Sequence, residues 1–248
     1  MEDADIFMRI CLESAEPVEK GIGTLGEKKL HAILKQYFEP DLNKHEIKVC
    51  GYVADIVNDK GIIEVQTRNL NCLRKKLDCF LKQRRVTVVY PIAYIKYLCW
   101  INDDTGFVTK RRKSPKIGTV YDSVRELYKL KPYLANPNLT ICLLLIDMEE
   151  YRHLNGWSHD KKKGSTREER IPLRLERECY LSNKMSYLTC FIPESLHTFF
   201  TTTDLAKAVG VSLTTAQTVT NILNHIGVLV KCGKTGRKYL YKRFTCKL

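Results

Sequence analysis

Apolar residues recur along the N-terminal part of the chain with two different periods, and these periods predict an alternation of helices and strands. Residues 24–38 carry apolar positions three or four apart, which is typical of a helix with one buried face. Two β-like runs follow at residues 47–57 and 62–67. Because residues 58–61 between them are rich in turn formers, they predict a hairpin loop.

A second helix is predicted next, because Asn69 is a suitable N-cap and the apolar positions after it repeat at helical spacing. Its expected core-facing positions are Leu70, Leu73, Leu77, Phe80 and Leu81. The further elements expected in this half are strands at residues 86–90, 92–101 and 139–147, a helix at residues 120–130, and basic loops at residues 110–116 and 152–178. Alternating strands and helices of this kind predict an α/β domain.

The last fifty residues follow a different pattern. A short helix from residue 203, a turn at residues 210–212 and a longer helix at residues 213–225 have the layout of a helix-turn-helix. A β-hairpin is predicted directly afterwards, at residues 227–242, and the combination resembles the winged-helix family of DNA-binding domains. The expected division is an α/β domain at residues 1–180, with its core at about 20–150 and a basic loop region at 152–178, and a winged helix at residues 190–248.

Charge favours nucleic acid as the partner. The 248 residues have a formal net charge of +13, and an excess of this size favours polyanions, nucleic acid ahead of acidic membrane surfaces. Residues 197–248 alone hold eight Lys or Arg and one acid. An alternative use of the winged helix, for protein contacts or dimerisation, would leave that charge without a role. The residues expected to contact DNA are Thr214, Thr215, Gln217, Thr218 and Asn221 on the longer helix and Lys234, Arg237 and Lys238 on the hairpin.

Composition argues against a secreted or membrane protein. A hydrophobic content of 44% with 28% charged residues is ordinary for a globular chain. The N-terminus is acidic where a signal peptide is basic, and no apolar run approaches the roughly 20 residues that span a bilayer. The ten cysteines include no Cys-x-x-Cys pair, so we expect small buried thiols, no structural zinc and a cytoplasmic protein.

The most informative local feature is a pair of acids, Asp55 and Glu64, on the two strands of the predicted hairpin. Side chains alternate across a strand, so Glu64 and Gln66 share one face. With a loop at residues 58–61, Asp55 lies opposite Glu64 at about 5 Å, where like charges destabilise a sheet. A hard divalent cation between two carboxylates removes the repulsion. The pattern therefore predicts a site for Mg²⁺ or Mn²⁺.

Around these acids the chain resembles the PD-(D/E)XK nuclease superfamily, whose restriction-endonuclease-like fold is a mixed sheet flanked by helices. Its members carry a Glu on the first helix, an Asp at the end of a strand and Glu-x-Lys on the next strand. The resemblance covers residues 20–100 and implies a Mg²⁺-dependent DNA endonuclease, a hydrolase that cuts phosphodiesters. It also allows for a homodimer, since nucleases of this fold often cut both strands as dimers. The residues implied by position are Glu27, Asp55, Glu64 and Gln66 for catalysis, the first three also for metal binding, and Arg68 and Lys75 for contact with nucleic acid.

The chain departs from this pattern at one position, because Gln66 stands where the family has lysine. Glutamine can position a water by hydrogen bonding but supplies no positive charge, which would have to come from Lys28, Lys75 or Arg68. Gln66 keeps open an alternative, a non-catalytic DNA-binding regulator that retains the nuclease fold. An RNA-directed enzyme or binder is a third interpretation, since phosphate contacts do not distinguish the two polymers.

Overall fold

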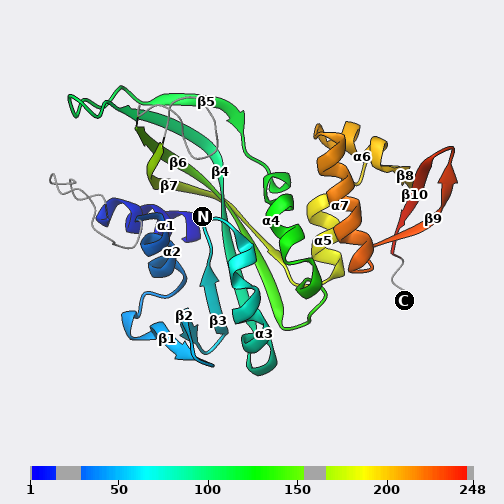
Figure 1. Ribbon diagram of the computed structural model, residues 1–248, viewed down its shortest axis with the longest axis horizontal. Coiled ribbons are helices and arrows are strands. Elements are labelled where there is room, and N and C mark those ends of the chain that lie inside the picture. The colour runs from blue at the N-terminus through cyan, green and yellow to red at the C-terminus, as the bar shows by residue number, and fades with distance from the viewer. Residues whose placement is uncertain (1, 15–28, 154–165, 245–248) are drawn as a thin grey trace.

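The computed structural model describes residues 2–153 and 166–244, apart from residues 15–28, and its elements are shown in Figure 1. The helices are α1 (Glu2–Glu13), α2 (Lys29–Phe38), α3 (Arg74–Gln83), α4 (Val124–Lys129), α5 (Lys184–Phe191), α6 (Thr202–Val209) and α7 (Leu213–His225), with short 3₁₀ turns η1 (Leu42–Lys44), η2 (Leu70–Leu73), η3 (Val120–Ser123) and η4 (Lys131–Tyr133). The strands are β1 (His45–Val49), β2 (Tyr52–Asn58), β3 (Gly61–Val65), β4 (Val86–Ile101), β5 (Arg112–Ile117), β6 (Leu139–His153), β7 (Thr166–Leu181), β8 (Phe199–Thr201), β9 (Leu229–Thr235) and β10 (Lys238–Arg243).

A seven-stranded mixed sheet is the centre of the fold, with helices on both faces (Figure 1). Its order is β1-β2-β3-β4-β6-β7, and β5 pairs with the second half of β4. Strands β3, β4 and β6 run parallel to one another, whereas the remaining pairs are antiparallel. The chain is therefore a mixed α/β protein, as the alternating pattern predicts.

Two hydrophobic clusters fill the two sides of this sheet. On one side α1 and α2 bury Phe7, Leu30 and Leu34 against the strands. On the other side α3 and α4 pack on the sheet, and the predicted stripe of the helix after residue 69 is buried at all five positions. That segment starts as the 3₁₀ turn η2 with Asn69 at its N-cap position, as predicted, but Asn69 has a left-handed backbone and its side chain makes no capping hydrogen bond.

Several strand boundaries differ from the sequence-based expectation. The run at residues 47–57 is two strands, β1 and β2, which meet at a turn where Cys50 and Gly51 both have positive φ. The expected four-residue hairpin loop is shorter by two, because Asn58 pairs with Gly61. Residues 86–101 are one continuous strand, since Pro91 sits within β4 without ending it.

Both predicted basic loops contain strands instead. Residues 112–117 form β5, and residues 166–178 belong to β7, which pairs with β6 over most of its length. Strand β7 lies at the edge of the sheet, where charged residues are common because they discourage pairing with other chains. A polar composition was therefore no sign of a loop at these positions.

Two of the nine cysteines that the structure describes are bonded, contrary to the expectation of reduced thiols. Cys50, in the turn between β1 and β2, forms a disulfide with Cys79 on α3. Cys72 and Cys232 are exposed rather than buried. Spacing along the chain could not reveal the bonded pair, because 29 residues separate partners that only the fold brings together.

Gly61 fixes the β2–β3 hairpin and cannot carry a side chain. Its φ is +127°, and a Cβ at this position would lie 2.3 Å from the carbonyl oxygen of Arg85. We expect Gly61→Ala to lower the free energy of unfolding by about 2–4 kcal/mol in a urea titration. Gly236→Ala is the matched control, since φ there is also positive but no atom lies within 4 Å, and it should cost about 1–2 kcal/mol. Equal losses for the two variants would contradict the steric argument.

The C-terminal part consists of α5, α6, α7 and a small sheet in the order β8-β10-β9. Helix α6 starts at Thr201, whose hydroxyl and backbone amide exchange hydrogen bonds with Asp204 in a capping box. Gly210, with φ +67°, ends α6, and the Ser212 hydroxyl accepts the Thr215 N–H to start α7. Each of these residues has a defined capping role, so the two helices and their tight connection follow from the local sequence.

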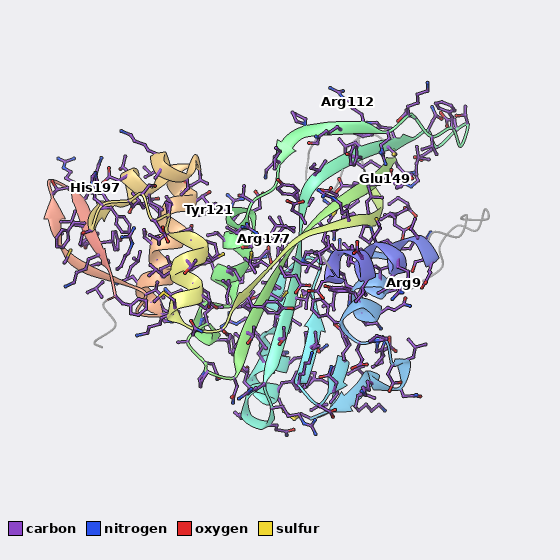
Figure 2. The ribbon with its side chains drawn as sticks, turned by 180° about the vertical axis from the view of Figure 1, so that it is seen from behind. Arg9, Arg112, Tyr121, Glu149, Arg177 and His197 are labelled. Carbon is purple, nitrogen blue, oxygen red and sulfur yellow. A yellow bond between two sulfur atoms is a disulfide. The ribbon has the colours of Figure 1, made fainter. Side chains whose placement is uncertain are left out.

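The C-terminal helices pack against the α/β sheet part, which is the seven-stranded sheet with the helices that cover it. Buried Val219 and Leu223 of α7 belong to the same hydrophobic cluster as Val124 of α4. The Tyr121 hydroxyl, labelled in Figure 2, donates to the Phe191 carbonyl at the end of α5 (3.0 Å). The helix α4 thus links the large sheet to α5 and α7 (Figure 1).

Candidate functional site

Asp55 on β2 and Glu64 on β3 lie side by side where the ladder between these strands ends. The ladder follows the predicted register up to its last pair, Ile56 with Ile63. At the next position side chains replace backbone pairing: the Asp55 N–H donates to Glu64 Oε1 (3.4 Å), and the Val65 N–H donates to Asp55 Oδ2 (2.8 Å). The two carboxylates are therefore neighbours, as the hairpin pattern predicts.

Each carboxylate also has a basic partner from a helix. Lys76 of α3 places its Nζ 2.8 Å from Glu64 Oε2. His31 of α2 places its Nε2 3.3 Å from Asp55 Oδ2. Only 1% of Glu64 is exposed to solvent, so its hydrogen-bond and ion-pair partners, rather than water, stabilise the carboxylate.

The two acids have opposite pKa shifts. Burial, together with the nearby charge of Asp55, raises the pKa of Glu64 to about 7, although Lys76 acts in the other direction. Burial also acts to raise the pKa of Asp55, but the hydrogen bond and charge of His31 and the Val65 N–H outweigh it and lower that pKa. One carboxylate therefore stays ionised at neutral pH while its neighbour exchanges a proton there, an arrangement common at functional sites.

The structure places the other residues predicted for this site as follows. The side chain of Gln66 donates from its amide to the carbonyl of Arg68. Arg68 and Lys75 are exposed, while Glu27 and Lys28 lie outside the described residues. Among the residues that the structure describes, no three His, Cys, Asp or Glu side chains form a potential metal-binding group.

Lys76 is the residue that sequence reasoning missed. It supplies the positive charge that was sought at Lys28, Lys75 or Arg68. Its spacing is a partial signal, because Lys76 lies three residues after buried Leu73 and four before buried Phe80, and residues so spaced are neighbours on a helix. Arg74 has the same two spacings, from Leu70 and Leu77, but is exposed, so the pattern does not single out Lys76.

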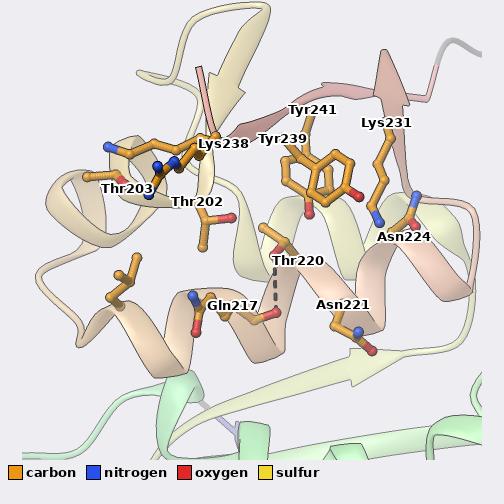
Figure 3. Close-up of a pocket in the computed structure, with 12 residues that line it drawn as sticks. Thr202, Thr203, Gln217, Thr220, Asn221, Asn224, Lys231, Lys238, Tyr239 and Tyr241 are labelled. Carbon is orange, nitrogen blue, oxygen red and sulfur yellow. Dashed lines mark hydrogen bonds between the residues drawn. The ribbon is translucent and has the colours of Figure 1, made fainter. Parts of the chain in front are cut away.

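A groove of about 370 Å³ separates α7 from the C-terminal hairpin β9–β10 (Figure 3). Gln217, Asn221 and Asn224 line it from α7, and hairpin residues that include Lys231 and Tyr239 line the opposite side. The ring of Tyr239 is 45% exposed, and the ammonium groups of Lys231 and Lys234 lie 4.2 and 5.1 Å from its centre. The groove therefore combines amides with lysines and an accessible aromatic ring.

The residues predicted to contact DNA from α7 fall on two sides of that helix. Gln217 and Asn221 face the groove, and Asn221 accepts a hydrogen bond from Lys131 (2.8 Å). Thr214, Thr215 and Thr218 instead line a separate pocket of about 250 Å³, shared with residues of η3 and α4. The predicted hairpin residues Lys234, Arg237 and Lys238 are all exposed.

The protein is a mixed α/β protein with a largely buried site of two neighbouring carboxylates. Each carboxylate has a basic partner from a helix, and the site lies where the β2–β3 ladder ends. The family described as a domain of unknown function, DUF8091, matches residues 28–182, which include this site and the whole large sheet. A relative from Treponema pallidum (strain Nichols), described as an uncharacterized protein, is 30% identical over 224 residues, 90% of this chain and 87% of the relative. The chain therefore belongs to the DUF8091 family. No solved structure matches it, and no helix within the described ranges is long and apolar enough to cross a membrane.

Proposed function

We propose that the protein is a metal-dependent DNA endonuclease of the PD-(D/E)XK type, with Asp55 and Glu64 holding Mg²⁺ or Mn²⁺. The observation that carries this proposal is the contact between these two acids at the end of the β2–β3 ladder. The charge of Asp55 beside a 1%-exposed glutamate raises the pKa of Glu64, so the pair is costly to the fold even with Lys76 and His31 as partners. The order of elements agrees with the resemblance, since α2 is followed by a strand bearing Asp55 and a strand bearing Glu64.

The site residues have complementary roles in this proposal. The oxygens of Asp55 and Glu64 are the hard ligands that Mg²⁺ prefers, and a bound ion would lower the pKa of a water and stabilise charge on the phosphate. Lys76, already 2.8 Å from Glu64, supplies the cation that Gln66 lacks. Glu64 must lose its proton to bind metal, so we expect activity to rise as the pH increases through about 7.

The test is cleavage of supercoiled, linear, branched and single-stranded DNA by the full chain in Mg²⁺, Mn²⁺ or EDTA. Cutting that requires the divalent ion supports the proposal. Retention of DNA without cutting of any substrate would favour the non-catalytic regulator, and cutting confined to RNA would favour the RNA-directed interpretation. The outcome thus separates the three functions that the sequence leaves open.

We also propose that α6, α7 and β9–β10 act as a winged helix that holds the DNA. The support is the groove between α7 and the hairpin, with its amides and exposed cations (Figure 3). Because Thr214 and Thr218 face α4, the groove and hairpin rather than those threonines should provide the contacts.

Removing two charges from the hairpin tests this second part. Arg237→Ala with Lys238→Ala should weaken DNA binding at low salt and reduce the slope of log affinity against log salt by about one to two. Fluorescence anisotropy of a labelled duplex in EDTA measures both quantities. Lys207→Ala, an exposed change on α6 at a residue that does not line the groove, is the matched control. Affinity and slope that remain those of the control would remove the hairpin from the interface.

A further inference from the structure

A small, arginine-lined cavity is formed partly by chain neighbours of the site residues. It has a volume of about 60 Å³ and is lined by Leu30, Thr67, Arg68, Arg167 and Arg170, together with Glu168 and Glu169. Leu30 precedes His31, the partner of Asp55, and Thr67 follows Gln66 at the end of the acidic motif. The cavity is therefore built from chain neighbours of the site and from strand β7, which the sequence did not reveal as a strand.

The cavity is lined by three arginines and two glutamates, so its walls carry charges of both signs. Glu169 accepts a hydrogen bond from the Lys29 N–H (3.0 Å), and Glu168 lies 3.1 Å from the ring of His153. Arg170 donates to the carbonyl of Thr67 (3.1 Å), which fixes its guanidinium at the cavity wall. A carbonyl contributes no charge, so this contact orients Arg170 without neutralising it.

More positive charge lies behind the cavity, around a single buried acid. Glu150 is 2% exposed and has three cationic partners: Arg152 at 2.6 Å, Arg167 at 3.1 Å and Lys96 at 3.8 Å. Five cations, Lys96, Arg152, Arg167, Arg170 and Arg68, stand against the three carboxylates of Glu150, Glu168 and Glu169, so the group keeps a positive excess of two.

The titration of Arg170 agrees with this geometry. Burial, followed by the repulsion of Arg167, lowers the pKa of Arg170 to about 10, although Glu150 acts against the shift. Gathering like charges costs folding free energy, and a bound anion would recover that cost.

The cavity has room for a small anion. Its volume of about 60 Å³ exceeds the roughly 10–15 Å³ that a single water needs. Arginine donates in a planar fork that matches phosphate oxygens.

We infer that Arg170 and Arg68, backed by Arg167, bind a backbone phosphate of the DNA next to the Asp55–Glu64 pair. This inference rests on the proposed function, and it names the residues that place the strand at the site. The contact needs no divalent ion, so it contributes to DNA affinity whether or not cleavage takes place. It also adds a second anchoring point besides the C-terminal hairpin.

Binding of a fluorescein-labelled DNA duplex to the full chain in EDTA tests the inference, because no cleavage enters the measurement. Arg170→Gln and Arg68→Gln should each weaken binding by about tenfold and reduce the salt slope by about one. Arg68 is exposed, so its variant should melt like the wild type even if Arg170→Gln is destabilised. Arg177→Gln, an exposed change on the same strand and labelled in Figure 2, is the control and should bind as the wild type does.

The outcomes separate this inference from the proposed cleavage. Wild-type affinity and slope in both Arg170→Gln and Arg68→Gln would overturn the phosphate site, even if the protein cuts DNA. The expected losses in a chain that never cuts would support the phosphate site and overturn the nuclease. A wild-type chain that does not bind DNA at all would overturn both.

Discussion

Asp55→Asn is expected to reduce metal-dependent DNA cleavage by about a thousandfold or more. An amide offers one neutral oxygen where the carboxylate offers charge, so the divalent ion loses a main ligand. Lewis-acid stabilisation of a reacting phosphate amounts to several kcal/mol, and each 1.4 kcal/mol is a factor of ten in rate. The measurement is the initial rate of nicking of supercoiled DNA in Mg²⁺.

Asp59→Asn is the matched control for this experiment. Asp59 lies in the two-residue turn of the same hairpin and is exposed, so the same chemical change should leave the rate within about a factor of two. DNA affinity in EDTA should be unchanged in both variants, since the phosphate contacts remain. Equal cleavage by Asp55→Asn and the wild type would show that the cutting comes from elsewhere or from a contaminant.

Glu64→Gln is expected to stabilise the protein at alkaline pH while it removes cleavage. The pKa of Glu64 is about 7 in the folded chain against an ordinary value of 4.5. Between these values the folded state binds more protons than the unfolded state, so stability falls as the pH rises from about 4.5 to 7. Above that window the ionised carboxylate costs about 3 kcal/mol, and glutamine does not incur this cost.

Urea titrations at pH 5 and pH 8 measure the effect. The wild type should lose stability between the two values relative to Glu64→Gln, and the gain of the variant should appear mainly at pH 8. Its amide oxygen can still accept a hydrogen bond from Lys76, but the NH2 group that replaces Oε1 cannot accept the Asp55 N–H. That loss is the same at both pH values, so the readout is the difference in stability between pH 5 and pH 8. A variant that is less stable than the wild type by the same amount at both pH values would mean that Glu64 serves the fold rather than a site.

Much of the site's scaffold was predictable because it depends on local pattern. The stripes on α2 and α3 follow helical spacing, and the β2–β3 register follows from alternation and from turn formers near residue 60. Helix α1 carries the same signal, since Phe7, Ile10 and Cys11 are buried at helical spacing, although no helix was predicted there.

What could not be predicted depends on contacts between distant segments. Strand β7 is mostly charged, and only its pairing with β6 makes it a strand. Arg167 and Arg170 lie on β7, so the basic cavity could not be predicted without this strand. The packing of α4 against α7, which turns Thr214 and Thr218 toward the α/β sheet part, likewise joins segments some ninety residues apart.

Binding of Mn²⁺, followed by electron paramagnetic resonance, tests the central claim most directly, because it reports on the Asp55–Glu64 pair without any substrate. The wild-type chain should hold one ion at pH 8 and bind it more weakly at pH 6, where Glu64 is protonated. The double variant Asp55→Asn with Glu64→Gln should lose this site. Equal Mn²⁺ binding by the double variant and the wild type would contradict the assignment of these two acids as the metal site.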